Sequence, residues 1–293
     1  MKLASFGEII WDVYENERTI GGAPLNIAAH AALYGFDSYL ISAVGDDDLG
    51  TDALNNVTRL GVKSDFVTTK LDIPTGRCNV ALGSGGVPTY TIEQVSAYDE
   101  IELPSVPLSD FDVLCFGTLA LRGQRNIDTL MKIVDTGNFA EIYADLNIRA
   151  PFYSRGSVEL CLKTASIVKI SDEELPTVAF LLDIEYTTVE AVAQRLAHLF
   201  PNIKLLVITL GANGSLCLDA KDGRVCRAAA QMATVRSTVG AGDSFGAAFL
   251  ASYIKHRDIP RALLTASHVS AFVVSSIEAI PAGSKEVFES KRA

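Results

Sequence analysis

The chain has 293 residues, of which 48% are hydrophobic and 20% are charged, a balance typical of a globular protein with a sizeable core. Its formal net charge of −10 argues against nucleic acid or an anionic membrane as a partner, because binding to such surfaces depends on Lys and Arg. The length allows one large domain or two ordinary ones.

We expect neither a membrane anchor nor an export signal. No stretch reaches the roughly 18–20 apolar residues that would span a bilayer, and Glu8 and Asp12 interrupt the first apolar run too early for a signal peptide. The five cysteines lack metal-site spacing, and Cys115 and Cys217 stand in apolar runs, which predicts buried, reduced thiols. These features together favour a cytoplasmic location.

Short β-branched runs alternate with longer segments of helical character along most of the chain. The expected strands are, in chain order, 3–10, 39–44, 112–117, 141–145, 167–170 and 205–210. The expected helices are 26–34, 127–134, 189–199 and 262–274. This α/β alternation predicts a central, mostly parallel sheet with helices on both faces, whose ligands bind at the carboxyl ends of the strands.

One region breaks this alternation. Residues 66–101 are strand-like throughout, with a hairpin turn expected at residues 84–86, and they contain no helix to cover a sheet. We therefore expect residues 13–21 and 66–101 to form a small β-sheet lid on a single α/β domain that spans residues 1–293.

A glycine-rich turn that leads directly into a helix is the most informative local pattern. Gly240 and Gly242 flank Ala241, and apolar residues recur with helical spacing from Phe245 onward. The backbone N–H groups of such a turn, together with the helix dipole, form a site for a phosphoryl group. Asp243 follows in the first helical turn, where it either complements the dipole or takes part in chemistry. The spacing differs from the dinucleotide-binding G-x-G-x-x-G, and no P-loop motif occurs.

A second motif far upstream gives this turn a functional context. Residues 21–35, GGAPLNIAAHAALYG, and residues 238–249, TVGAGDSFGAAF, resemble the N- and C-terminal signatures of the ribokinase-type (pfkB) carbohydrate kinases, in the expected order. The resemblance covers essentially the whole chain. It implies a ribokinase-like fold with a small β-sheet lid, and transfer of a phosphoryl group from ATP, with Mg²⁺, to a hydroxyl of a small sugar.

The resemblance assigns the central chemistry to the glycine turn. Asp243 matches the general base that takes the proton of the sugar hydroxyl, and Gly240, Ala241 and Gly242 match the anion hole for the transferred group. Positioning and charge neutralisation carry most of the catalysis in phosphoryl transfer, because its transition state is loose. At a helix N-terminus, we expect the carboxyl of Asp243 to have a low pKa.

The resemblance also implies where the two substrates bind. The residues that match the sugar site, with further candidates on the substrate side, are Asp12, Gly21, Gly22, Asn26, Tyr90, Asn147 and Arg149. The residues that match the nucleotide site are Lys169, Thr209, Gly211 and Gly214, with His268 either near the adenine or an ordinary packed histidine. Glu174 matches the acidic residue that helps to hold Mg²⁺ through water.

Several details are more similar to fructokinases, bacterial ones above all, than to ribokinases. They are residues 88–92 (PTYTI) with 97–99 (AYD), 117–122 (GTLALR) and 145–149 (DLNIR). The last also resembles 2-keto-3-deoxygluconate kinases, in which the matching arginine contacts an acidic sugar, although a structural ion pair of Arg149 is equally open. Fructose is therefore the leading substrate, and an acidic sugar is the nearest alternative. A nucleoside kinase and a catalytically weak sugar-binding sensor are further alternatives.

Two departures from the family pattern concern a monovalent cation. Ser237 stands where the family usually has an aspartate that helps to bind this cation, and residues 275–279 lack the usual glycine. Activation by K⁺ is therefore in question. The resemblance also implies that the lids of two chains pair, so we expect a homodimer.

Overall fold

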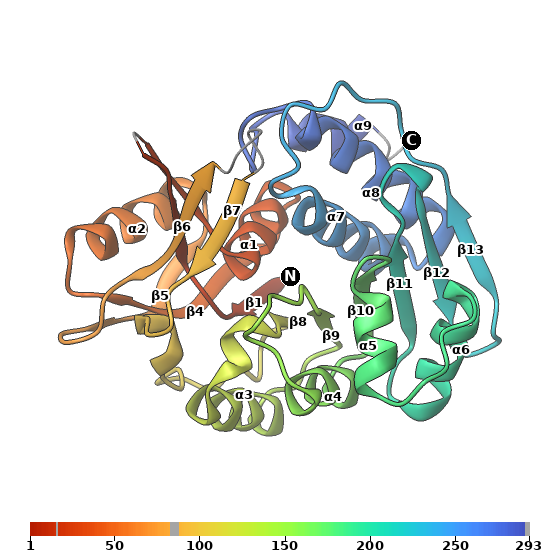
Figure 1. Cartoon of the computed structure of the whole chain (residues 1–293), viewed down its shortest axis with the longest axis horizontal. Coiled ribbons are helices and arrows are strands. Elements are labelled where there is room, and N and C mark those ends of the chain that lie inside the picture. Colours follow the sequence, from red (N-terminus) through yellow and green to blue (C-terminus); the bar gives the residue numbers. More distant parts are fainter. Residues whose placement is uncertain (16, 83–87, 291–293) are drawn as a thin grey trace.

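The computed structural model describes residues 1–15, 17–82 and 88–290, which form a large and a small sheet with flanking helices (Figure 1). The strands of the large sheet are, in spatial order, β13 (Val225–Ala228), β12 (Ser215–Asp219), β11 (Leu205–Thr209), β10 (Ile167–Ser171), β9 (Glu141–Asp145), β8 (Val113–Gly117), β1 (Lys2–Phe6), β4 (Asp37–Gly45) and β5 (Lys63–Lys70). Those of the small sheet are β3 (Arg18–Gly21), β2 (Ile10–Val13), β6 (Gly76–Leu82) and β7 (Pro88–Ile92).

The large sheet is mostly parallel. From β11 to β5 all adjacent strands are parallel, whereas β12 pairs with both β11 and β13 in the antiparallel sense. The carboxyl ends of the parallel strands therefore meet at one edge, where ligands bind in sheets of this class.

Helices cover both faces of the large sheet, as the alternation predicted. One face packs against α3 (Gln124–Thr136), α4 (Arg155–Thr164), α5 (Leu175–Leu181) and α6 (Val189–Leu199). The other packs against α1 (Ala23–Leu33), α2 (Asp48–Arg59), α7 (Ala241–His256), α8 (Ile259–Val274) and α9 (Ser284–Ser290). Short 3₁₀ helices are η1 (Ala97–Glu100), η2 (Leu119–Arg122) and η3 (Gly211–Asn213).

Alternate residues of the central strand β8 explain this two-sided burial. Leu114 and Phe116 belong to the core on the α3 side, whereas Val113 and Cys115 belong to the core beneath α1 and α7. A parallel strand that is buried on both faces needs a continuous apolar run, as this sequence has. Cys115 and Cys217 are buried free thiols, as expected.

The predicted first strand, 3–10, is wrong because two strands share that segment. β1 ends at Phe6, and β2 begins at Ile10 in the small sheet. Gly7 lies between them with a φ of 147°, and a Cβ added there would lie 2.5 Å from Pro24 Cγ. The chain therefore leaves the large sheet at a position that only glycine can occupy without strain.

The expected lid limits also need correction. β5 lies in the large sheet, so residues 66–70 are not part of the small sheet. η1 contacts β4, α3 and η2 of the main body, and its buried Tyr98 packs against Ile10 and Cys78 of the small sheet. The small sheet consists of β3, β2, β6 and β7, which draw on residues 10–13, 18–21, 76–82 and 88–92. β6 and β7 pair in the antiparallel sense, but the expected turn at 84–86 lies outside the described residues.

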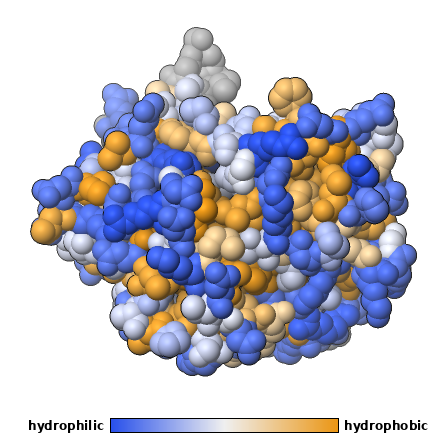
Figure 2. Space-filling model, turned by 90° about the horizontal axis from the view of Figure 1, so that it is seen from below, coloured by the Kyte–Doolittle hydropathy of each residue, from blue (hydrophilic) through white to orange (hydrophobic). Residues whose placement is uncertain are grey.

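The surface mixes residue types. On the face seen from below, hydrophilic side chains are interspersed with apolar ones (Figure 2). Within the described part of the chain, none of the helices combines the length and the apolar character that crossing a membrane requires.

Candidate functional site

The predicted catalytic residues lie at the start of α7. Gly240 precedes the helix with a left-handed backbone (φ 77°), which residues with a side chain rarely adopt. Ala241 and Gly242 open the helix, and Asp243 stands half-buried in its first turn. The first N–H groups of a helix have no acceptor within it, so this turn can bind an anion.

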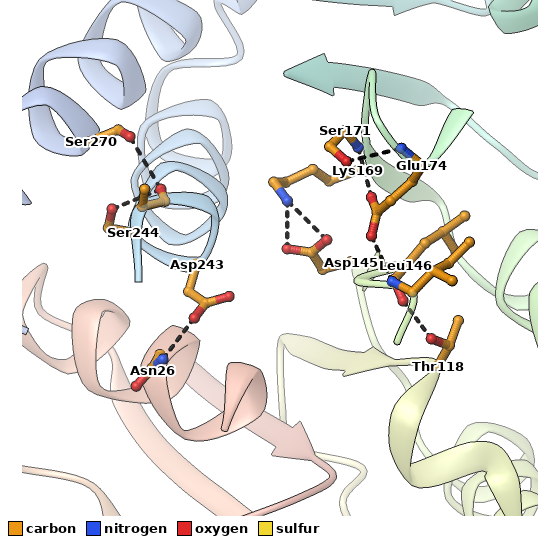
Figure 3. Close-up of polar contacts among 12 residues, drawn as sticks. Asn26, Thr118, Asp145, Leu146, Lys169, Ser171, Glu174, Asp243, Ser244 and Ser270 are labelled. Carbon is orange, nitrogen blue, oxygen red and sulfur yellow. Dashed lines mark hydrogen bonds and ion pairs between the residues drawn. The ribbon is translucent and has the colours of Figure 1, made fainter. Parts of the chain in front are cut away.

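Asn26 of α1 reaches Asp243 across a separation of 217 residues in the chain. Its Nδ2 atom donates a hydrogen bond to Asp243 Oδ2 at 2.7 Å (Figure 3). Asn26 Oδ1 is buried and has no hydrogen-bond partner among the described residues, so it can accept a bond from a ligand hydroxyl. The predicted base and a predicted sugar-binding residue thus lie together.

The pKa of the Asp243 carboxyl is raised, so the expectation of a low value was wrong. Burial raises it, and this effect outweighs the Asn26 hydrogen bond and the positive charges of Lys169 and Arg149, which act in the opposite direction. The expectation from the helix N-terminus alone omitted desolvation, which disfavours a carboxylate. A raised pKa makes Asp243 a stronger proton acceptor than an ordinary aspartate.

A buried ion pair faces the glycine turn. Lys169 Nζ lies 2.9 Å from Asp145 Oδ1 and 2.8 Å from Oδ2, and both side chains are buried (Figure 3). A Cβ added at Gly242 would lie 3.3 Å from Lys169 Nζ, so the ammonium group is next to the turn. Burial raises the pKa of Asp145 to about 6, against the charge of Lys169. Whether Lys169 contacts the nucleotide stays a prediction.

Glu174 connects two strand ends at this edge of the sheet. One carboxylate oxygen accepts a hydrogen bond from the Ile148 N–H at 2.6 Å, and the other accepts one from the Ser171 N–H at 2.8 Å (Figure 3). Asn147, beside Ile148, has a left-handed backbone with a φ of 41°. Such strain persists only where neighbouring contacts enforce it, and Glu174 supplies one of these contacts.

The small sheet brings Asp12 and Tyr90 to one face. Asp12 pairs with Cys78, and the next pair on that face joins Val80 to Tyr90. Residues that are directly paired, or two apart on one strand, point to the same side of a sheet. The Tyr90 side chain is 52% exposed there. A Cβ added at Gly21 would lie 3.6 Å from Asp12 Oδ2, so this glycine also borders the site.

Arg149 lies shortly after the end of β9, at the same edge of the sheet. It is exposed and forms no ion pair within 4.0 Å with another described residue, which leaves the structural alternative without a partner. Its charge nevertheless lowers the pKa of Asp12, Glu8 and Asp243, opposing the effect of their burial. Arg149 therefore lies within electrostatic reach of all three carboxylates.

The other residues predicted to bind the nucleotide lie at the end of β11, around η3 and on α8. Thr209 ends β11, where it pairs with Ser171 of β10, Gly211 begins η3, and Gly214 follows η3 directly. His268 lies half-buried on α8, a helix that contacts β12 and β13. Their roles in binding the nucleotide stay predictions.

The sequence analysis missed Glu8 as a site residue. Only 3% exposed, it follows β1 and contacts Gly22, where a Cβ would lie 2.4 Å from the Glu8 carbonyl oxygen. Burial raises the pKa of Glu8 from 4.5 to about 7, and the charge of Asp243 adds to this. An acid directly after an apolar strand is the signal that would have identified it.

Replacement of Glu8 by glutamine is expected to change how stability depends on pH. Between pH 4.5 and about 7 the folded wild type binds more protons at Glu8 than the unfolded chain, so its free energy of unfolding falls as pH rises. The variant lacks this decrease, so its free energy of unfolding should rise by about 3 kcal/mol relative to that of the wild type across this pH range. Urea unfolding at pH 4.5 and 8 measures the difference. Glu286→Gln, at an exposed position, is the control. If the difference in free energy of unfolding between Glu8→Gln and the wild type were independent of pH, as for this control, the prediction would be contradicted.

Comparison with known proteins gives a consistent result. The model of the pfkB family of carbohydrate kinases matches residues 2–285. A putative sugar kinase from Pyrococcus horikoshii is 27% identical over 280 residues, covering 86% of this chain and 83% of its own. A fructokinase from Klebsiella pneumoniae is 28% identical over 247 residues, covering 80% and 77%.

A solved structure shares the fold. The fructokinase from Xylella fastidiosa, solved with bound ATP, superposes with a TM-score of 0.86 over 100% of this chain and 99% of its own, at 19% identity. The predicted ribokinase-like arrangement, a large mostly parallel sheet with a separate small sheet, is thereby confirmed.

Proposed function

Because the chain belongs to the pfkB family of carbohydrate kinases, we propose that it transfers the γ-phosphoryl group of ATP to a hydroxyl of a small sugar, with fructose as the leading substrate. The observation that carries the proposal is the half-buried Asp243 carboxylate, held by Asn26 at the N-terminus of α7. Relatives named fructokinase support the sugar, and the ATP-bound fructokinase supports the nucleotide.

In the proposed mechanism, Asp243 accepts the proton of the attacking sugar hydroxyl. The Asn26 hydrogen bond orients the carboxylate, and the raised pKa of Asp243 suits it to take up a proton. The N–H groups of the turn formed by Gly240, Ala241 and Gly242 bind the transferred phosphoryl group, and Lys169 adds positive charge beside them. Positioning and electrostatics thus carry the reaction.

The residues present fit a water-mediated Mg²⁺ ion at Glu174. Each Glu174 oxygen accepts one backbone N–H and retains a lone pair for a metal-bound water. No group of three or more His, Cys, Asp or Glu side chains suited to a metal occurs in the described ranges, which agrees with an ion held largely by phosphates and water. When bound, Mg²⁺ would neutralise charge on the phosphates of ATP.

The small sheet is proposed to act as a lid that closes over the sugar and excludes water. Its outer strands β3 and β7 each have a free edge among the described strands, and pairing of two lids would cover such edges. We therefore propose a homodimer. Sedimentation at micromolar concentration should give twice the mass of 31.3 kDa, and only monomer would contradict it.

The test is ADP release from Mg-ATP with fructose, ribose, 2-keto-3-deoxygluconate, adenosine and inosine, each with and without K⁺. We expect saturable turnover with fructose and no response to K⁺. Ser237 provides a hydroxyl where the family usually has a carboxylate for the cation, and this hydroxyl already accepts a hydrogen bond from the Val239 N–H. Turnover only with 2-keto-3-deoxygluconate would favour the acidic-sugar alternative, which Arg149 supports because it is exposed and forms no ion pair with another described residue. No turnover with any compound would overturn the proposal.

A further inference from the structure

His30 occupies a buried position on α1, one helical turn beyond Asn26. Its imidazole is 0% exposed, with Nε2 3.0 Å from the Ala279 carbonyl oxygen and Nδ1 3.2 Å from the Tyr34 hydroxyl. A carbonyl can only accept, so Nε2 carries the proton and Nδ1 accepts the bond from Tyr34. The Tyr34 ring in turn stacks on Phe288 at a centroid distance of 4.1 Å. These contacts fix one neutral tautomer in one orientation.

The His30 bond ends directly beneath the phosphate-binding turn. A Cβ added at Gly240 would lie 2.8 Å from Ala279 Cβ and 2.9 Å from its carbonyl oxygen, so the two residues are in close contact. Any shift of Ala279 must therefore move Gly240 or open a gap under it.

The segment that carries Ala279 is packed through the buried Ala279 and Pro281 and through Ile280, but few hydrogen bonds tie it to distant parts of the described chain. Residues 275–281 connect α8 to α9 without helix or strand. The other hydrogen bonds found for this segment are local, such as those from the Ser275 and Ser276 N–H groups to the last turn of α8. The bond from His30 instead spans 249 residues of the chain.

We propose that His30 is a positioning residue for the phosphoryl-receiving turn, acting through the Ala279 carbonyl. α1 then supports the site at two points: Asn26 orients Asp243, and His30 fixes the floor against which Gly240 packs. Burial lowers the pKa of His30 to about 4, so the imidazole stays neutral near pH 7 and keeps this bonding pattern. The expected change in kcat rests on the proposed function, whereas the expected change in the order of the turn does not.

The expected effect is on turnover, because His30 supports the turn and not the small sheet. His30→Leu keeps an apolar side chain of similar size but loses the donor, which should loosen residues 237–243 and lower kcat about 10- to 100-fold. The KM for the sugar should stay within about threefold. His30→Gln retains an N–H donor and should recover most of kcat. Tyr34→Phe removes only the hydrogen bond to Nδ1, so its kcat should lie between those of His30→Leu and His30→Gln.

A matched control separates positioning from general destabilisation. Asn126 is also fully buried and bonds three backbone groups, those of Tyr98, Ile101 and Ala120, away from α7. Asn126→Ala should lower the midpoint of thermal unfolding at least as much as His30→Leu does, yet leave kcat near the wild-type value.

Hydrogen exchange tests the inference even if no sugar is turned over. We expect faster amide exchange in residues 237–243 and 275–281 of His30→Leu, reversed in His30→Gln and absent from Asn126→Ala. Wild-type exchange of both segments in His30→Leu would overturn the inference. A kcat loss in Asn126→Ala as large as in His30→Leu would also overturn it. If the variants show these exchange effects but the wild type turns over no sugar, the proposed function fails and the structural role of His30 stands.

Discussion

Asp243→Asn is expected to lower kcat by about 10²–10⁴-fold, because an amide cannot accept the proton of the sugar hydroxyl. The substitution preserves size and the possibility of a hydrogen bond with Asn26. It also removes a carboxylate whose pKa is raised by burial, so the free energy of unfolding should be unchanged or slightly higher. Steady-state kinetics with Mg-ATP and fructose, together with thermal unfolding, measure both quantities.

The matched control is Asp128→Asn, since Asp128 is an exposed aspartate on α3 that bonds Gln124. This variant should keep wild-type kcat. Turnover of Asp243→Asn close to that of the control would exclude Asp243 as the base. A large loss of sugar affinity with little change in kcat would instead assign Asp243 to substrate binding.

Lys169→Met is expected to lower the free energy of unfolding by about 3–5 kcal/mol at pH 8, because it leaves the buried carboxylate of Asp145 without its partner. The deficit should shrink on acidification. Burial already raises the pKa of Asp145 to about 6, and loss of the lysine raises it further. Asp145 then becomes protonated in the folded variant at moderately acid pH, which removes the buried charge.

Two comparisons sharpen this experiment, with urea unfolding at pH 5 and pH 8 as the measurement. The double variant Lys169→Met/Asp145→Asn should recover most of the lost stability, because no unpaired charge is buried. Lys204→Met is the matched control: Lys204 is half exposed, and its partner Glu141 keeps its bonds to Arg257 and Ser166, so the cost should be below about 1 kcal/mol. Equal losses in both single variants would contradict the assignment.

The sequence by itself determined the features that depend on neighbouring residues. The strand Glu141–Asp145 and the helix Val189–Leu199 match their predicted limits, because apolar periodicity and β-branched content act locally. The turn at residues 240–242 and the helix after it could also be predicted from the sequence, because glycine spacing and helical periodicity lie within one short segment. The two signatures identified the carbohydrate kinase family in the same way.

Only the tertiary structure decided the features that arise between distant segments. It joined Asn26 to Asp243 and paired Lys169 with Asp145, contacts for which no local pattern exists. It also placed β5 in the large sheet instead of the small one.

The raised pKa of Asp243 is the clearest case, because the sequence predicted the opposite direction. The helix dipole is a local property, but desolvation depends on every segment that packs around a group and excludes water from it. The same reason explains why Glu8 and His30 gained significance only in the folded chain: both are polar groups whose properties follow from burial.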